Sequence, residues 1–353
     1  MSNLTQLENE TIAFDSFYFY ETEQFTLLWI LFIAIVFGNC GVLYKVLRKK
    51  ARNHRMNYFI RHLAIADLLV GLVNVLTDII WRFTISWNLG NAACKIIRYL
   101  QVVITYGSTY ILVSLSIDRC DAIRYPMQFS SSWRKARILI WSAWFTSVIV
   151  SLPIIFLYNE KIIQDHPQCW IAFEEQWQWR LYMSVVAISL FIIPVIIISY
   201  CYSVIIFIIR SRSKKLSSCI GIKAKASDSS SGIIPKAKIK TVKISLVIVA
   251  VFILCWSPYI IFDLLQVYGY IPATQTNIAI ASFIQSLTPL NSAANPLIYF
   301  IFSTHFSRFI RNCPLLRWFG CKYQQKPDVT CNQSQISTQS EILTSTKSNK
   351  FEF

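Results

Sequence analysis

Seven long apolar segments follow one another along this chain, and they restrict its fold more than any other feature. Six of them contain no Asp, Glu, Lys or Arg, and the second contains four charged side chains. Each is long enough for a helix that crosses a bilayer, and none alternates as a barrel strand does. We therefore predict an all-α membrane protein, a seven-transmembrane helix bundle followed by a short amphipathic eighth helix. The segments are residues 25–44, 58–83, 99–117, 138–158, 181–209, 244–262 and, from about Thr276, the second half of 264–304.

The distribution of basic residues predicts how the chain lies in the membrane. The net charge of +16, taken alone, would fit a protein that binds nucleic acid. However, residues 45–55 hold six basic residues, 119–137 hold five and 210–243 hold ten, whereas 1–24 and 264–276 hold none. Basic residues in alternate loops mark the cytoplasmic side of a membrane. We expect a multi-pass plasma-membrane protein in contact with lipids, with its N-terminus outside, its C-terminus inside and no nucleic-acid partner.

The chain before the first span differs in composition from the bundle, which we place at residues 25–301. Residues 1–24 are expected to form an extracellular tail. Asn3 and Asn9 each begin an Asn-X-Thr sequence, so we expect both to be glycosylated.

The chain after the last span is expected to stay in the cytoplasm. Residues 302–313 place apolar and basic side chains on opposite helix faces, which predicts a helix that lies on the membrane surface. Residues 314–353 are expected to be a disordered tail because the stretch is rich in Ser and Thr and poor in apolar residues. Cys313 and Cys321 are candidates for palmitoylation, and two unmodified thiols are the alternative.

The cysteines predict one disulfide bond. Of the ten cysteines, only Cys94 and Cys169 fall on the expected outer side. Two cysteines in an oxidising compartment are expected to pair. The bond would hold the long second outer loop over the mouth of the bundle.

Polar residues at similar depth in three spans predict a buried cluster. Asp67 lies in the middle of the second span, Ser108 in the third, and Asn291 and Asn295 in the seventh. A buried carboxylate needs partners, so these four side chains are expected to converge. Their oxygens suit a sodium ion, and a water-filled hydrogen-bond network without an ion is the alternative. We expect no cofactor apart from this allosteric sodium, and the sequence carries no enzyme signature.

Prolines within the spans indicate a bundle that changes its packing. Pro153, Pro194, Pro258 and Pro296 lie in four different spans. Each removes a backbone hydrogen bond and permits a kink, which a switching bundle can use as a hinge.

Short motifs in a fixed order make the chain resemble the rhodopsin-like family of G-protein-coupled receptors. The resemblance covers residues 25–313. It implies that binding of an agonist opens the inner face to a heterotrimeric G protein, and that arrestin and a receptor kinase act at the tail. The motifs are Gly38-Asn39, residues 63–67, Trp87 with Cys94, Asp118-Arg119, Trp144, Pro194, Tyr202, residues 255–258, Asn291 and residues 295–299. The implied activation switch consists of Asp118, Arg119, Tyr202, Trp256, Asn295, Pro296 and Tyr299.

Within this family, longer stretches resemble the vasopressin/oxytocin-like branch with the neuropeptide S receptors, and most of all the crustacean cardioactive peptide receptors of arthropods. They are residues 17–24, 74–82, 232–243 and 257–263. The resemblance implies a small amidated, disulfide-cyclised neuropeptide as agonist. Another vasopressin-like or neuropeptide S-like peptide is the alternative. We expect calcium release through a Gq-type protein, with a rise in cyclic AMP as the alternative.

The outer halves of the spans favour a peptide over other ligands. No lysine occurs from 244 to 304 to bind retinal, and no acid occurs from Cys94 to Ile117 to bind an amine. Arg98 and Gln101 lie one helical turn apart and suit backbone carbonyls or an amidated terminus, unless Arg98 only reaches to the interface. We expect a polar cavity with an aromatic floor. Its further residues are Asn74, Asp78, Trp256, Tyr259, Asp263 and Gln285.

The inner halves of the spans argue against the rival class, a transporter or channel. A transport path needs polar residues across the whole bilayer, whereas Leu115, Phe252 and other aliphatics are expected to seal the inner half. Many members of the family hold the inner arginine with an acid on the sixth span. Here that position is Lys238, so we expect Arg119 to pair only with Asp118 and the off state to be weakly held. The alternative is that Lys238 points to solvent or lipid phosphates.

Overall fold

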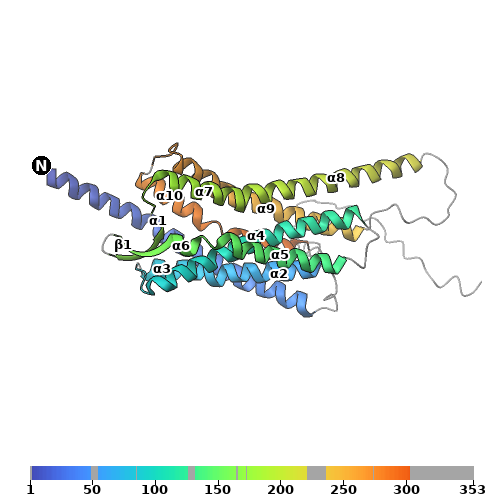
Figure 1. The fold of residues 1–353 in the computed structure, drawn as a ribbon, viewed down its shortest axis with the longest axis horizontal. Helices are drawn as coiled ribbons and strands as arrows, with labels where there is room; N and C mark the ends of the chain where they lie inside the picture. Colours follow the sequence, from blue (N-terminus) through green and yellow to red (C-terminus); the bar gives the residue numbers. More distant parts are fainter. Residues whose placement is uncertain are drawn as a thin grey trace, which may run out of the picture. The chain divides into compact units, whose positions relative to one another are not determined.

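A computed structural model of the chain describes residues 2–48, 55–84, 86–125, 132–163, 166–171, 173–220, 236–272 and 274–302. They form a bundle of helices that run side by side (Figure 1), with α4 packed against α2, α5 and α9. The elements are α1 Ser2–Arg48, α2 Arg55–Leu69, η2 Val70–Val75, α3 Leu76–Thr84, α4 Gly90–Arg124, α5 Ser132–Ser151, α6 Ile154–Leu157, β1 Tyr158–Ile163, β2 His166–Ile171, α7 Gln176–Val186, η3 Ala187–Ile192, α8 Ile193–Ile220, α9 Lys236–Val267, α10 Gln275–Ser286 and α11 Leu290–Ile301.

The helices match the predicted spans, and the last one is broken. Six described helical segments are long and apolar enough to cross a membrane, namely Glu23–Leu47, Arg55–Thr84, Gly90–Arg124, Trp133–Leu157, Gln176–Ser211 and Val242–Val267. The seventh predicted span is two shorter helices, α10 and α11, joined by a turn at residues 287–289. Pro289 lacks a backbone N–H, so it suits the start of α11 and cannot continue the ladder of α10. The seven-helix bundle is therefore confirmed, with a discontinuous last helix.

The four prolines lie at irregular points of the helices. Pro153 separates α5 from α6, and Pro194 is the second residue of α8, which follows the π-helical segment η3. Pro258 lies inside α9 and Pro296 inside α11. These positions leave backbone carbonyls without their usual partners, which is the condition for a kink.

A two-stranded hairpin adds strand structure that the sequence did not predict. The strands β1 and β2 pair antiparallel, with Glu160 opposite Cys169 in the register. The residues of the hairpin include strand-forming Tyr158, Ile162 and Trp170. The second outer loop is thus a folded element and not an irregular segment.

The core lies around α4, which is the most deeply buried span. Large apolar side chains from six spans meet there, and two glycines let helices approach closely. A Cβ on Gly107 would lie 2.8 Å from the Trp144 ring, and one on Gly38 would lie 2.9 Å from Pro296. The apolar centre includes Phe59, Ile111, Leu115, Ile140, Ile248 and Phe252.

Several predicted features lie outside the described part of the chain. They are the amphipathic helix from residue 303 onward, the tail with Cys313 and Cys321, and the side chains of Asn3, Asn9 and Lys238. They stay predictions.

Candidate functional site

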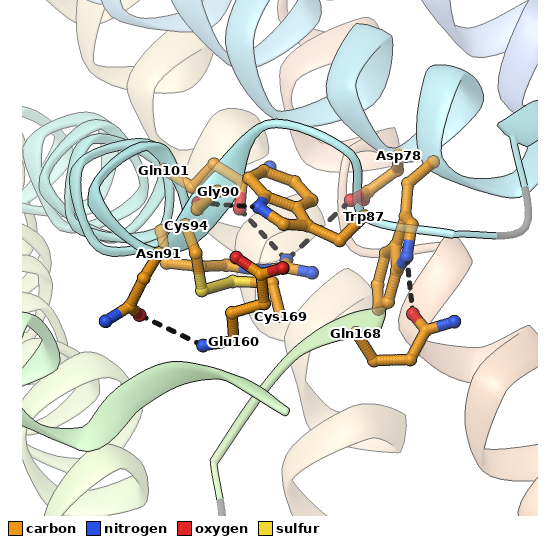
Figure 2. The surroundings of a disulfide bond; sticks show 11 residues. Asp78, Trp87, Gly90, Asn91, Cys94, Gln101, Glu160, Gln168 and Cys169 are labelled. Carbon is orange, nitrogen blue, oxygen red and sulfur yellow. Dashed lines mark hydrogen bonds and ion pairs between the residues drawn. A yellow bond between two sulfur atoms is a disulfide. The ribbon is translucent and has the colours of Figure 1, made fainter. Parts of the chain in front are cut away.

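The disulfide predicted from the sequence is present at the mouth of the bundle. It joins Cys94 on α4 to Cys169 on β2, with the two Cα atoms 5.5 Å apart and both residues buried (Figure 2). The bond ties the hairpin to the start of the third span, as expected. A cross-link of this kind stabilises a domain by roughly 2–4 kcal/mol, chiefly by limiting the unfolded chain.

Further bonds anchor the hairpin on both sides of the disulfide. The indole of Trp81 donates to the side-chain carbonyl of Gln168 at 2.8 Å, and the Trp87 backbone N–H donates to the Pro167 carbonyl at 2.7 Å. On the other strand, the Glu160 N–H donates to the side chain of Asn91 at 3.0 Å (Figure 2). Because α3, α4 and the loop between them all contribute, the hairpin is a fixed wall above the bundle.

Arg98 is the centre of the outer polar group. Its guanidinium donates to Gln101 Oε1 at 3.0 Å and lies 4.0 Å from the Asp78 carboxylate. The same guanidinium lies over the rings of Trp81 and Tyr158, at 4.7 and 5.5 Å from their centroids. Arg98 therefore does not simply reach to the membrane interface. It is held in place by an acid, an amide and two aromatic faces, which orients its donors.

Two aromatic members of this group were missed by the sequence reasoning. Trp81 comes from α3 and Tyr158 begins β1, and both contact Arg98. Burial raises the pKa of the Tyr158 phenol above its ordinary value, so the ring stays neutral beside the cation. Their positions depend on how the hairpin folds back, which no local pattern in the sequence reveals.

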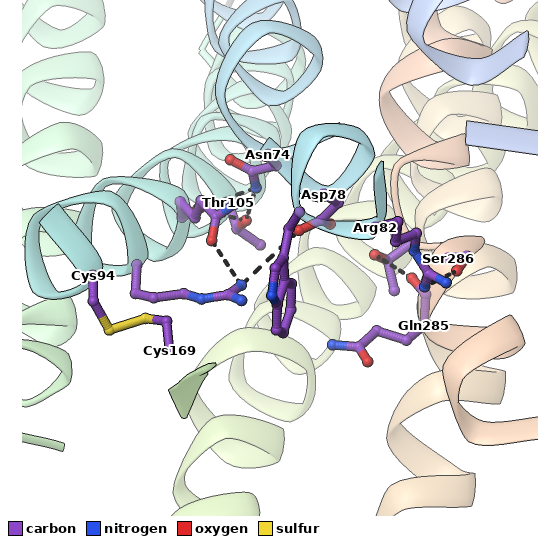
Figure 3. Close-up of polar contacts among 12 residues, drawn as sticks. Asn74, Asp78, Arg82, Cys94, Thr105, Cys169, Gln285 and Ser286 are labelled. Atoms are coloured by element: carbon purple, nitrogen blue, oxygen red, sulfur yellow. Dashed lines mark hydrogen bonds and ion pairs between the residues drawn. A yellow bond between two sulfur atoms is a disulfide. The ribbon is translucent and has the colours of Figure 1, made fainter. Parts of the chain in front are cut away.

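The other predicted ligand residues fall into two sets. Asn74 lies close to Arg98's helix, where its amide donates to the Gln101 carbonyl at 3.2 Å and to Thr105 Oγ1 at 2.9 Å (Figure 3). Asp263 lies beside Tyr259 on the sixth span. Gln285 is exposed on α10, with no side-chain hydrogen bond among the described residues. The structure thus joins the second and third spans directly, while the sixth and seventh contribute separately.

The predicted aromatic floor is a stack on the sixth span. The Trp256 ring lies 6.0 Å from that of Tyr259 and 6.4 Å from that of Phe252. Phe252 also meets Phe191 of η3 at 6.2 Å. These edge and tilted contacts join Tyr259, Trp256, Phe252 and Phe191 into one connected group of rings.

A polar clasp at the outer ends of the first, second and seventh spans was not predicted. Arg82 donates to Gln24 Oε1 at 2.5 Å and lies 3.4 Å from the hydroxyls of Ser282 and Ser286 (Figure 3). Ser282 also donates to Gln24 at 3.2 Å. These contacts connect the helix ends that border the outer polar group.

The buried cluster in the middle of the bundle is centred on Asp67, as predicted, but its members differ in part. Ser108 and Ser292 donate to Asp67 Oδ1 at 2.8 and 2.9 Å, and Asn295 donates to Oδ2 at 2.7 Å. Ser292 was missed. Asn291 is buried one turn before Asn295, but its side-chain oxygen has no partner among the described residues. The three donors are neutral, so this carboxylate has no cation among its hydrogen-bond partners.

The oxygens around Asp67 fit a small hard cation. The carboxylate and two hydroxyls are together, and the side-chain oxygens of Asn291 and Asn295 are buried without a hydrogen-bond partner in the described residues. Sodium would be held by these oxygens, with the carboxylate supplying the charge. The described residues offer no group of three or more His, Cys, Asp and Glu side chains that could hold a transition metal.

The inner end of the third span carries a second buried carboxylate with a different environment. Asp118 forms ion pairs with the neighbouring Arg119 and with Arg55 at the start of α2. The Arg55 guanidinium also donates to the Asp118 backbone carbonyl at 3.4 Å. The pairing of Arg119 with Asp118 was predicted. The ion pair between Arg55 and the same carboxylate was not predicted.

Of the remaining predicted switch residues, one lies near the Asp118 carboxylate and its arginines, and another lies near Asp67. Tyr202 on α8 lies beside Arg119 and the hydroxyls of Ser116 and Ser245. Tyr299 on α11 lies near Asp67, and its hydroxyl has no hydrogen-bond partner in the described residues. Between these regions Leu115 and Phe252 are almost completely buried, as expected for a sealed inner half.

Comparisons with known proteins agree with this arrangement. Residues 38–299 match the model of the 7 transmembrane receptor (rhodopsin family). The neuropeptide S receptor of Homo sapiens is 42% identical over 319 residues, covering 89% of this chain and 82% of that receptor. The isotocin receptor of Catostomus commersonii is 32% identical over 335 residues, covering 92% and 84%. The oxytocin receptor of Ovis aries is 31% identical over 293 residues, covering 78% and 74%.

Proposed function

This chain belongs to the rhodopsin family of seven-transmembrane receptors, and on that premise we propose that its agonist is a small amidated, disulfide-cyclised neuropeptide of the crustacean cardioactive type. Proteins of this family are G-protein-coupled receptors and not enzymes, and they are multi-pass proteins of the plasma membrane. The relatives named as neuropeptide S, isotocin and oxytocin receptors support a neuropeptide ligand.

The proposal rests on the Arg98 guanidinium, which Gln101, Asp78 and two aromatic rings hold in one orientation. With Gln101 beside it, the group offers N–H donors to peptide carbonyls, and Asp78 nearby accepts from amide or basic groups. Its donors are already oriented by Trp81 and Tyr158, so a peptide loses less conformational entropy when it binds. Lipid agonists would leave these polar groups without partners, which costs binding energy.

A second candidate is a peptide of the neuropeptide S type. It is favoured by the neuropeptide S receptors, which are the more similar relatives at 42% identity for the human protein. The first candidate peptide is distinguished by its disulfide ring and its terminal amide. Variants of the peptide that lack one of these features can therefore decide between the two candidates.

Signalling would follow from repacking of the bundle. A peptide that shifts Tyr259 moves the ring stack with Trp256, and the prolines of α9 and α11 allow the inner ends to separate. Arg119 then leaves Asp118 and meets Tyr202, which opens a face for a heterotrimeric G protein. We propose Gq-type coupling with calcium release, and cyclic AMP as the alternative output. The N-terminus lies outside, and arrestin and a receptor kinase act at the cytoplasmic tail.

The test is a peptide panel on cells that express the full chain, with calcium and cyclic AMP read in parallel. The panel contains the amidated cyclic cardioactive peptide, its free-acid and ring-opened forms, neuropeptide S and oxytocin. We expect the amidated cyclic form to be the most potent. Silence toward every form of it, with a response to neuropeptide S, would replace the first candidate by the second.

Arg98→Ala tests whether the outer polar group around Arg98 binds the peptide agonist. Loss of a buried charged partner typically costs about 2–5 kcal/mol, so potency should fall at least about thirty-fold at equal surface expression. Lys95→Ala, one turn earlier on α4, is the matched control because it removes a cation with no ion pair among the described residues. Equal effects of the two substitutions would show that general positive charge, and not this site, attracts the peptide.

A further inference from the structure

One face of α5 carries a continuous stripe of exposed side chains that no other described element covers. Arg134, Arg137, Ile138, Trp141, Ser142 and Phe145 recur at helical spacing and line a shallow groove of about 730 Å³. The rings of Trp141 and Phe145 are each 68% exposed. The opposite face of α5 is buried, with Ala136, Ile140, Ala143 and Ser147 turned to the other helices. The stripe therefore faces the membrane and not the core.

The two arginines of the stripe differ from the lysine between them. Lys135 lies 3.5 Å from Asp121 of α4, so its charge is balanced within the protein. Arg134 and Arg137 are exposed and form no ion pair with any described side chain. They lie one turn apart at the start of α5, so both guanidiniums can reach the same anion.

The stripe is ordered along the membrane normal. Arg134 and Arg137 lie at the start of α5, close to the contact between Lys135 and Asp121. This is the same end of the bundle as Asp118 and Arg119. Ile138, Trp141 and Phe145 follow in turn toward the middle of the bilayer. A ligand that fits must have a negative group at the membrane surface and an apolar chain that runs inward.

We propose that this groove is a binding site for one anionic phospholipid of the cytoplasmic leaflet. Its phosphate and headgroup are bound by Arg134 and Arg137, and one acyl chain lies over Ile138, Trp141 and Phe145. Guanidiniums bind phosphate oxygens in a bidentate manner, and the cytoplasmic leaflet supplies anionic lipid. The volume is within the range of small-molecule sites, roughly 300–1,000 Å³, which suits a headgroup with the first part of a chain.

Quenching of Trp141 by brominated lipid tests the site. The full chain is placed in nanodiscs of phosphatidylcholine that contain increasing fractions of phosphatidylserine with brominated acyl chains. Because the chain has 11 tryptophans, the Trp141 signal is taken as the difference between wild type and Trp141→Phe. We expect this signal to be quenched at a much lower fraction of brominated phosphatidylserine than of brominated phosphatidylcholine.

The contribution of Arg134 and Arg137 to lipid binding is then compared with that of Lys135, which is paired with Asp121. Each basic residue near an anionic surface contributes about a five-fold gain, so Arg134→Gln with Arg137→Gln should raise the half-quenching fraction about ten- to thirty-fold. Lys135→Gln should leave it unchanged, and Arg134→Lys with Arg137→Lys should restore most of it. All three variants should show wild-type quenching by brominated phosphatidylcholine, which verifies that the face is intact.

Three results would overturn the proposal. Equal quenching by both brominated lipids would mean that the groove takes any acyl chain. An equal loss in Lys135→Gln would mean that the basic surface as a whole, and not the arginine pair, attracts anionic lipid. Displacement of the brominated lipid by cholesterol but not by unbrominated phosphatidylserine would assign the groove to a sterol and would also contradict the proposal.

Discussion

The middle and the inner end of this bundle each hold a completely buried carboxylate, and the two are balanced in opposite ways. Asp67 receives hydrogen bonds from two serines and an asparagine and has no cation as a partner. Asp118 is bound by two arginines from different helices. One region thus has an excess of negative charge and the other an excess of positive charge.

This difference indicates what each region can do. A buried charge without a counter-charge is costly, so we propose that the Asp67 region binds a mobile cation in one packing and releases it in the other. The Asp118 region needs no external ion. In the activation step proposed above, Arg119 would leave while Arg55 stays and keeps Asp118 neutralised, which would lower the cost of opening the inner face.

The largest expected difference between the regions is in stability. Asp118→Ala leaves two arginines side by side without their acid, and breaking a buried pair in this way costs about 3–5 kcal/mol. Asp67→Asn removes an unbalanced charge and keeps hydrogen-bonding capacity, so its cost should stay within about 1 kcal/mol. Thermal unfolding of the purified receptor in sodium-free buffer compares them. If Asp67→Asn were the more destabilised, our assignment of the charge balance would be reversed.

A smaller effect, on signalling and not on stability, is expected from Arg55→Gln. Without Arg55, release of Arg119 leaves Asp118 unpaired, and the lost charge-assisted bond is worth roughly 1.5–3 kcal/mol. Agonist-free signalling and maximal response should both fall at equal surface expression. Basal signalling that rises instead would show that Arg55 ties α2 to α4 and holds the off state.

The smallest effect, a decrease in basal signalling, is expected from Lys238→Glu. An acid at this position would supply the inner lock that the sequence lacks. Exposed ion pairs contribute about 0.5–1 kcal/mol, which would lower the on/off ratio roughly two- to five-fold. Basal calcium release at matched expression measures it, with Lys243→Glu on the same helix as control. Unchanged basal release would mean that Lys238 points to solvent or lipid.

The features that the sequence predicted best depend on spacing within one segment or on topology. The spans follow from apolar length, the Cys94–Cys169 bond from the side of the membrane, and the Arg98–Gln101 contact from one helical turn. Asp67 was expected at the centre of a polar cluster because a buried charge needs partners, and it is there.

The features that the sequence did not reveal depend on how distant segments meet. Arg55 begins α2 and reaches Asp118, 63 residues later, only through the packing of α2 on α4. Tyr158 reaches Arg98 because the outer loop folds into a hairpin. Ser292 differs from Asn291 by one position, and only the rotation of α11 decides which of them faces Asp67. Rotations of this kind are set by tertiary packing and not by local pattern.

Sodium dependence of stability tests the central claim, the unbalanced charge of Asp67, most directly. The melting temperature of the purified receptor is measured in sodium chloride and in potassium chloride of equal ionic strength. A bound ion at about ten times its Kd adds roughly 1.4 kcal/mol, so the wild type should melt a few degrees higher in sodium. Asp67→Asn should lose this difference, whereas Arg55→Gln should keep it. A wild type that melts equally in both salts, or a sodium effect that survives in Asp67→Asn, would contradict the account.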